Sequence, residues 1–116
     1  MGELFEIREY AEDGRSPFAE WFDELNPVTA ARVDRYIRRL ESGNFGAAKM
    51  LRDGVFELRL DFGPGYRVYF GRYGRIVVIL LGGGSKRRQD ADIAAAGARW
   101  QRYQQAKKAK EHGSDS

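Results

Sequence analysis

The amino-acid sequence predicts an α+β domain in which helices pack against an antiparallel-rich sheet. Three strand-like runs follow one another across two short turns between residues 54 and 81. Two helix-start signals precede these runs, and a long helical pattern follows them. We therefore expect the order β-α-α-β-β-β-α, which comprises a first strand, an αα-hairpin, a three-stranded meander and a C-terminal helix, with the helices on one face of the sheet.

Length and composition narrow the classes of protein to which the chain can belong. With 116 residues, it can form one core but not two, so we expect a single domain over residues 1–106 and a polar, disordered tail over residues 107–116. The absence of cysteine excludes a disulfide framework and a cysteine-based zinc site. No apolar run approaches the roughly 20 residues that cross a bilayer, and the acidic N-terminus does not resemble a signal peptide. We expect a cytoplasmic protein that binds no membrane.

Charge is divided unevenly along the chain. Residues 1–26 hold eight acidic side chains and two arginines, whereas the rest holds eighteen basic and nine acidic residues. This asymmetry points to an anionic partner for the later part of the chain, with ordinary solvated helix faces as the alternative explanation. The polar side of the second predicted helix carries a run of arginines for which a solvated face is the usual explanation: Arg32, Arg35, Arg38 and Arg39.

Two helices are expected in the N-terminal half, after a first strand at residues 4–10. Ser16 and Asn26 each precede a proline, a pairing typical of an N-cap followed by the first helical position. Apolar residues then recur at helical spacing to residue 25 in the first helix and residue 40 in the second, which Gly43 ends. Because only a cap separates the two helices, they form an αα-hairpin.

The meander and the final helix follow a loop at residues 43–54. The three strands are expected at residues 55–61, 66–72 and 76–81. Apolar and polar side chains alternate in the first two, and the third is apolar on both faces, as in an interior strand. Gly82–Gly84 is expected to allow a tight exit from the third strand, before a helix from Arg88 to Lys108. The inner side of this helix is expected to follow Ile93, Gly97, Trp100 and Gln104, with Ala96 and Tyr103 beside them.

A cationic cradle is predicted on one face of the meander. Antiparallel neighbours on the same face lie side by side, so we expect Arg59 and Arg67 together on an exposed surface. Lys86 and Arg87 follow the third strand and close the rim of this surface. Converging guanidinium groups match pairs of phosphate oxygens, so the pattern favours a phosphate backbone as the ligand.

The other residues of that face leave two interpretations open. Tyr69 could stack on a base or supply a hydroxyl group, which suits RNA. Alternatively, Glu57 or Asp61 forms cross-strand salt bridges with the arginines on a merely solvated sheet. The pattern alone does not distinguish a binding site from such bridges.

Other chemistries find little support in the residues present. The triglycine lacks the spacing of a phosphate-binding P-loop. The single histidine, His112, lies in the predicted tail, so neither a histidine base nor a histidine metal site is expected. Asp90 and Asp92 open the final helix, where carboxylates suit the helix dipole better than a metal ion. We expect no metal and no cofactor.

Two segments carry a resemblance to a known family: LRDGVFELRLDFGPGYRVYF at residues 51–70 and GGGSKRRQDADIAAA at residues 82–96. They resemble the RelE/ParE superfamily of type II toxins, and are most similar to the HigB-like subgroup of addiction module killer proteins. The resemblance extends over nearly the whole chain and implies a RelE-like fold. It also implies a cytosolic bacterial toxin that is neutralised by a cognate helix-turn-helix antitoxin.

The resemblance further implies a metal-independent endoribonuclease. RelE-like members cut mRNA in the ribosomal A site through attack of a 2′-hydroxyl group on the adjacent phosphate, which requires a cationic cradle and proton transfer. By position, Arg67 and Arg59 match basic residues on the cradle strands, and Arg87, with Lys86 beside it, matches the basic residue after the last strand. Further candidates for RNA contact are Lys49, Arg52 and Arg88.

Two departures from the RelE pattern affect proton transfer. Glu57 replaces a lysine of the first meander strand, and Ile93 replaces a tyrosine early in the last helix. The acid–base role would then fall to Tyr69, Glu57 or Lys86, and the resemblance does not choose among them. Two other functions stay open: a ParE-like inhibitor of DNA gyrase without nuclease activity, and an inactive relative that only binds an antitoxin.

Overall fold

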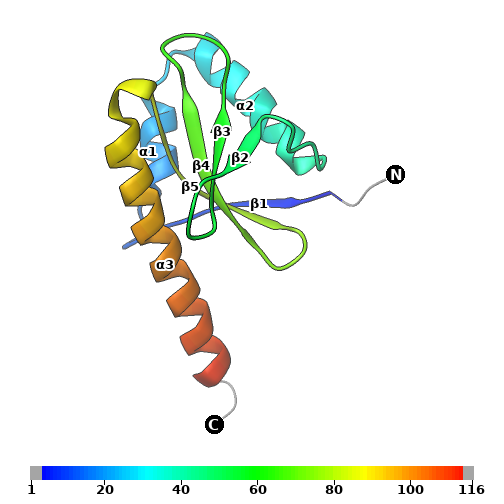
Figure 1. Ribbon diagram of the computed structural model, residues 1–116, viewed down its shortest axis with the longest axis vertical. Helices are drawn as coiled ribbons and strands as arrows, with labels where there is room; N and C mark the ends of the chain where they lie inside the picture. The colour runs from blue at the N-terminus through cyan, green and yellow to red at the C-terminus, as the bar shows by residue number, and fades with distance from the viewer. Residues whose placement is uncertain (1–3, 114–116) are drawn as a thin grey trace.

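The computed structural model describes residues 4–113 and has an α+β fold built on one five-stranded sheet (Figure 1). Its elements are β1 (Glu6–Glu9), α1 (Pro17–Asp23), α2 (Pro27–Glu41), β2 (Ala48–Met50), β3 (Val55–Arg59), β4 (Arg67–Tyr73), β5 (Val77–Gly84), a 3-10 turn η1 (Lys86–Arg88) and α3 (Gln89–Gly113). The strands lie in the order β1-β5-β4-β3-β2, with β1 parallel to β5 and all other neighbours antiparallel. The predicted α+β class, αα-hairpin and β3–β4–β5 meander are confirmed.

Both helices of the αα-hairpin begin where the sequence predicts. The Ser16 hydroxyl oxygen accepts a hydrogen bond from the backbone N–H of Ala19, and the Asn26 side-chain oxygen accepts one from the N–H of Thr29. A proline follows each cap, at a position where its missing N–H leaves no donor unsatisfied. Local sequence therefore determines both helix starts.

Helices cover both faces of the sheet, so the prediction that they share one face is wrong. α1 and α2 cover one face, where the buried core contains Phe18, Val33, Ile37, Leu40, Leu58, Leu60, Val68, Phe70, Val78 and Leu80. α3 covers the other face, where Ala96 and Trp100 belong to a second buried cluster with Tyr69 and Leu81. The second face carries large apolar side chains of its own, and burying them requires a second layer of helix.

Residues 43–54, which the sequence predicts to be a loop, contain the short strand β2. It pairs with β3, so that Ala48 lies opposite Leu58 and Met50 opposite Phe56. Three residues are too few to display a recognisable alternation, which is why the pattern does not reveal this strand. β2 lies at one edge of the sheet and has β3 as its single strand neighbour.

The glycines at residues 82–84 lie within β5 and do not form the expected turn after it. They continue the pairing of β5 with β4. A Cβ atom at Gly83 would overlap the indole of Trp21, and one at Gly84 would overlap the Asp92 carboxylate. Glycine is needed in this strand because α1 and α3 close on it from opposite sides.

α3 begins at Gln89, one residue after its predicted start, and its C-terminal part projects beyond the sheet in Figure 1. It continues to Gly113, through residues that the sequence assigns to a disordered tail, while residues 114–116 lie outside the described range. Its inner side follows Ala96 and Trp100; Gln104, which the sequence places on that side, is exposed. Neither α3 nor any other helix within residues 4–113 combines the length and hydrophobicity needed to cross a membrane.

Gly83→Ala is expected to destabilise the fold, whereas Gly97→Ala is expected to stabilise it. The methyl group added at residue 83 overlaps the Trp21 ring, and overpacking of this kind costs about 1–3 kcal/mol. Gly97 lies in α3 with no atom within 4 Å of its Cβ position, so alanine there gains up to ~1 kcal/mol of helix propensity. Urea denaturation measures both free energies of unfolding, and equal midpoints would contradict the close packing around β5.

Candidate functional site

The register of the sheet brings the predicted cradle residues together on one face. Arg59 of β3 lies opposite Arg67 of β4, and Glu57 lies opposite Tyr69. On the other side of β3, Lys49 of β2 lies opposite Glu57. Because paired residues share a face, these five side chains project from the α3 side of the sheet. The prediction that Arg59 and Arg67 lie side by side on one face is therefore confirmed.

Most of this face is buried, so the expectation of an exposed arginine surface is wrong. Glu57 and Tyr69 are 0% exposed and Arg67 is 6% exposed. The first turns of α3 lie over them, and Gln89 contacts Glu57 directly. Arg59 differs from the other three because 58% of its side chain is exposed at the end of β3.

The Glu57 carboxylate accepts hydrogen bonds from three side chains. We call Glu57 and these three donors the Glu57 network. Its Oε1 accepts hydrogen bonds from Arg59 Nε at 3.1 Å and from Arg67 Nη1 at 3.3 Å. Its Oε2 accepts one from Gln89 Nε2 at 2.8 Å. The salt bridging that the sequence left open as an alternative is thus present, though in a buried site and not on a solvated sheet. Much of the Arg67 charge is consequently engaged inside the protein.

Tyr69 cannot stack on a base, contrary to one expectation from the sequence, because its ring is enclosed. Its hydroxyl group is buried and has no hydrogen-bond partner among the described residues. Burial raises the pKa of Tyr69 well above the ordinary value of 10.0, and the nearby Glu57 charge raises this pKa further. The hydroxyl group therefore stays protonated at neutral pH and lies out of reach of a large ligand.

Asp92, which the sequence pattern connects only with the helix dipole, is also a member of the site. Its carboxylate packs over the position where Gly84 lacks a Cβ atom. Burial raises the pKa of Asp92 above the ordinary value of 3.8, against the opposing charges of Arg88 and Arg99. Asp92 as a whole is partly exposed. The sequence marks Asp92 only by its position in the segment at residues 82–96 that carries the family resemblance, three residues after Gln89.

Several exposed basic side chains lie at the end of the sheet where β5 ends and η1 begins. η1 presents Lys86, Arg87 and Arg88 to solvent, and these three residues line a hollow of about 400 Å³ with the first residues of α3. Lys86 and Arg87 form no ion pair among the described residues. We call these three residues and Arg59 the cationic rim. It can bind an anion without first breaking an internal contact of Lys86 or Arg87.

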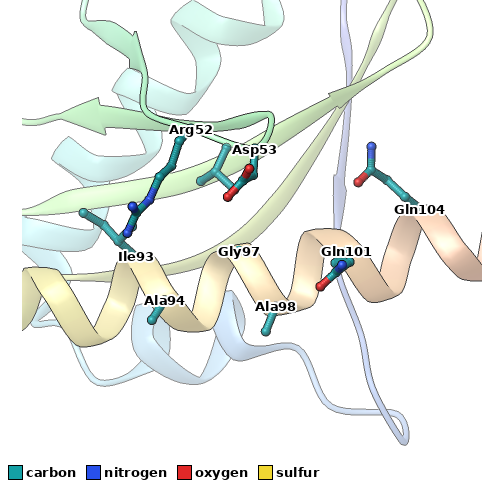
Figure 2. A pocket seen from close by; sticks show the side chains of 9 residues that line it. Arg52, Asp53, Ile93, Ala94, Gly97, Ala98, Gln101 and Gln104 are labelled. Carbon is teal, nitrogen blue, oxygen red and sulfur yellow. The ribbon is translucent and has the colours of Figure 1, made fainter.

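The predicted RNA-binding residues do not all lie on this rim. Arg88 belongs to it, and exposed Lys49 extends from the edge strand beside Glu57. Arg52 instead belongs to the β2–β3 turn and faces α3 near Ile93, across a cavity of about 610 Å³ (Figure 2). A smaller hollow next to that cavity is lined by Arg52, Ile93 and Asp90, and Asp90 also lines the hollow beneath η1. Together the hollows follow the N-terminal half of α3.

The site is suited to anion binding and offers few groups for proton transfer. Of the three acid–base candidates, Glu57 and Tyr69 are buried and Lys86 is exposed. Asp92, as a partly exposed residue, adds a carboxylate. Within residues 4–111, whose side chains the structure describes, no group of three or more acidic, histidine or cysteine side chains is arranged to hold a metal ion.

Comparison with known proteins identifies a relative in Haemophilus influenzae (strain ATCC 51907 / DSM 11121 / KW20 / Rd), described as an uncharacterized protein. The two chains are 48% identical over 80 residues, which is 68% of this chain and 81% of the relative. No family model matches the chain. Identity at this level over most of both chains indicates a shared fold.

Glu57→Ala is expected to lower the free energy of unfolding by about 3–5 kcal/mol, because it leaves Arg67 as a buried charge without its partner. Glu20→Ala is the matched control, since Glu20 also pairs with an arginine but does so in solvent. Urea denaturation should show a large loss for the first variant and little change for the second. Similar midpoints for the two variants would show that the Glu57 network does not stabilise the fold.

Asp92→Asn is expected to stabilise the protein at neutral pH and to change its pH dependence. A carboxyl group whose pKa is raised on folding contributes stability below its unfolded value, here 3.8, and loses that contribution as the pH rises through the folded value. Asparagine does not titrate, so the difference in stability between variant and wild type should grow over that interval. Thermal or urea unfolding from pH 3 to 8 measures this difference, and a constant difference would contradict the raised pKa.

Proposed function

We propose a toxin function for this chain, which belongs to the same family as the uncharacterized Haemophilus influenzae protein. In this proposal the chain is the toxin of a type II toxin–antitoxin system of the RelE/ParE superfamily. Its fold, with an αα-hairpin before a mixed five-stranded sheet and a long C-terminal helix, is compatible with a RelE-like protein. The resemblance of residues 51–70 and 82–96 to HigB-like toxins supplies the specific family.

The activity we propose is cleavage of mRNA in the ribosomal A site. The cationic rim is the observation that carries this proposal. Lys86 and Arg87 have no ion-pair partner among the described residues, and Arg59 is exposed at the same end of the sheet. Convergent cations of this kind suit a phosphodiester, whose negative charge increases as a nucleophile adds to phosphorus.

The proposed reaction needs no group beyond the RNA and the protein. The 2′-oxygen of one nucleotide forms a bond to the adjacent phosphorus, and the bond from phosphorus to the 5′-oxygen of the next nucleotide breaks. The products are a 2′,3′-cyclic phosphate and a free 5′-hydroxyl group. Arg59 and Arg87 stabilise the charge on the phosphate oxygens, and the Glu57 network holds Arg59 from behind.

Proton transfer in this reaction falls to the accessible groups of the site. The 2′-hydroxyl group loses a proton and the leaving 5′-oxygen gains one. Glu57 and Tyr69 are both fully buried and are poorly placed for either role. Lys86 is exposed and Asp92 is partly exposed, so these two groups are the candidates that remain. In our proposal Asp92 accepts the first proton and Lys86 supplies the second.

A second candidate function is inhibition of DNA gyrase, as in ParE-like toxins. The observation that favours it is the burial of Glu57 and Tyr69, which removes two of the three acid–base candidates from contact with a substrate. An inhibitor acts by protein contact and needs no proton transfer. In either case we propose a helix-turn-helix antitoxin as the partner, and an adjacent gene that encodes such a protein would support this pairing.

Arg87→Ala and Arg59→Ala are each expected to reduce mRNA cleavage by about 10²- to 10³-fold, the usual effect of removing one donor that stabilises transition-state charge. Arg15→Ala is the matched control because Arg15 is exposed and pairs with Glu20, away from the rim. Inducing each variant in a bacterial host, with growth curves and primer extension on abundant mRNAs, measures toxicity and cleavage. Circular dichroism checks that each variant is folded.

The outcomes separate the candidate functions. Growth arrest with A-site cleavage, lost in the two rim variants and kept in the control, supports the nuclease. Growth arrest with intact mRNA, DNA double-strand breaks and an SOS response would instead favour gyrase inhibition. A folded wild-type protein that arrests nothing would contradict both toxin functions and leave an antitoxin-binding relative.

A further inference from the structure

The arginine run of α2 separates into one paired residue and three that face solvent without an ion pair. Arg38 is held by two carboxylates of its own helix, with Nε 3.6 Å from Asp34 and Nη1 2.8 Å from Glu41. No ion pair occupies the other three within the part of the chain that the structure describes: Arg32, Arg35 and Arg39. We call these three residues the cationic strip. They lie at i, i+3 and i+7, so they share one side of the helix.

Aromatic rings support two guanidinium groups of the strip. The guanidinium carbon of Arg32 lies 3.9 Å from the centre of the Phe62 ring, and that of Arg39 lies 4.4 Å from the centre of the Tyr36 ring. Stacking of this kind restrains the planar group while its N–H donors stay available at the edges. The strip is therefore partly preorganised for an anion.

One carboxylate lies nearby without cancelling the strip. The hydroxyl group of Tyr36 donates a hydrogen bond to Asp61, and this bond, more than the charges of Arg39 and Arg32, lowers the pKa of Asp61. Asp61 forms no ion pair with either arginine among the described residues. The strip consequently keeps a net positive charge.

The strip adjoins the cationic rim through the β3–β4 turn, which lies between the N-terminal end of α2 and the start of α3 in Figure 1. Arg32 stacks on Phe62 of this turn, and the rings of Phe62 and Tyr66 lie 5.5 Å apart. A Cβ atom at Gly65 would lie 3.1 Å from that of Lys86. The turn carries no lysine or arginine of its own, but it contacts Arg32 of α2 on one side and Lys86 of η1 on the other.

We propose that the cationic strip binds the phosphate backbone of double-helical RNA. Arg32, Arg35 and Arg39 are spaced ~4.5 and ~6 Å along a rigid helix, at about 1.5 Å per residue, which suits contact with successive phosphates. Single-stranded RNA is usually held by bases stacked on open aromatic rings, but arginines cover Phe62 and Tyr36 here. Duplex RNA requires no stacking platform, because proteins recognise it through shape and backbone.

A protein partner fits this surface less well. Protein interfaces bury an apolar centre, and the single large apolar side chain that α2 exposes within the described range is Val28. The inference extends the proposed function by a second contact with the same class of ligand, and it does not require that the rim cleaves RNA. An arrangement with an unpaired strand at the rim and a flanking duplex on α2 would use both surfaces together.

Fluorescence anisotropy of the full chain with a labelled RNA duplex of about 16 base pairs tests the proposal. The double substitution Arg32→Ala with Arg35→Ala should weaken binding about tenfold or more and reduce the slope of log K against log salt by about 2, one for each arginine–phosphate pair removed. Arg38→Ala, on the same helix but already ion-paired, is the matched control and should bind within about twofold of the wild type. Circular dichroism confirms that α2 persists in each variant.

The results distinguish this proposal from the proposed function. Reduced duplex binding in the strip variant alone supports the inference, even if no variant cleaves mRNA. Wild-type affinity in the strip variant, or an equal loss in Arg38→Ala, would overturn it. A strip variant that binds RNA normally but no longer co-purifies with the antitoxin would assign this surface to the protein partner and would also overturn it.

Discussion

The buried carboxylate of Glu57 sets how the sheet and α3 fit together. Three donors from three different elements converge on it: Arg59 from β3, Arg67 from β4 and Gln89 from α3. A buried arginine without a counter-charge is strongly unfavourable, so Arg67 depends on this carboxylate. Since Gln89 opens α3, the same contact also fixes where η1 ends. The position of the rim thus follows from an interaction inside the protein.

The arginines of this chain serve two physical roles that their spacing alone does not distinguish. Arg67 and Arg38 are engaged by carboxylates and contribute to the fold. Arg87 and Arg35 have no such partner among the described residues and are available to an anion. A surface arginine next to a carboxylate gains little from a ligand, because it must exchange one anion for another. The functional proposals therefore rest mainly on the second group. Arg59 is the exception, because its side chain is 58% exposed although its Nε is hydrogen-bonded to Glu57.

The sequence predicts local structure well, and also which residues share a face of a strand. It predicts poorly whether the residues of the site are exposed to solvent. Alternation correctly placed Glu57 and Tyr69 with the arginines on one face, because the backbone of a strand imposes a period of two. Whether that face is exposed to solvent depends on α3, whose inner residues Ala96 and Trp100 are distant in sequence from Glu57 and Tyr69. Helical spacing places Ala96 and Trp100 on the inner side of the final helix, and both are buried, but it does not show which face of the sheet that side covers. A packing partner that distant cannot be read from a local run.

The parallel pairing of β1 with β5 has a consequence for how the chain acquires its structure during synthesis. Glu6 pairs with Val77, so the first strand gains a strand neighbour only when the last strand, β5, has been made. Such distant contacts are slow to form because a long loop must close first. Chains emerge from the ribosome N-terminal end first, so the αα-hairpin appears well before the sheet that covers its apolar side. A nascent chain that has not yet released β5 can neither pair β1 nor bring η1 to the sheet.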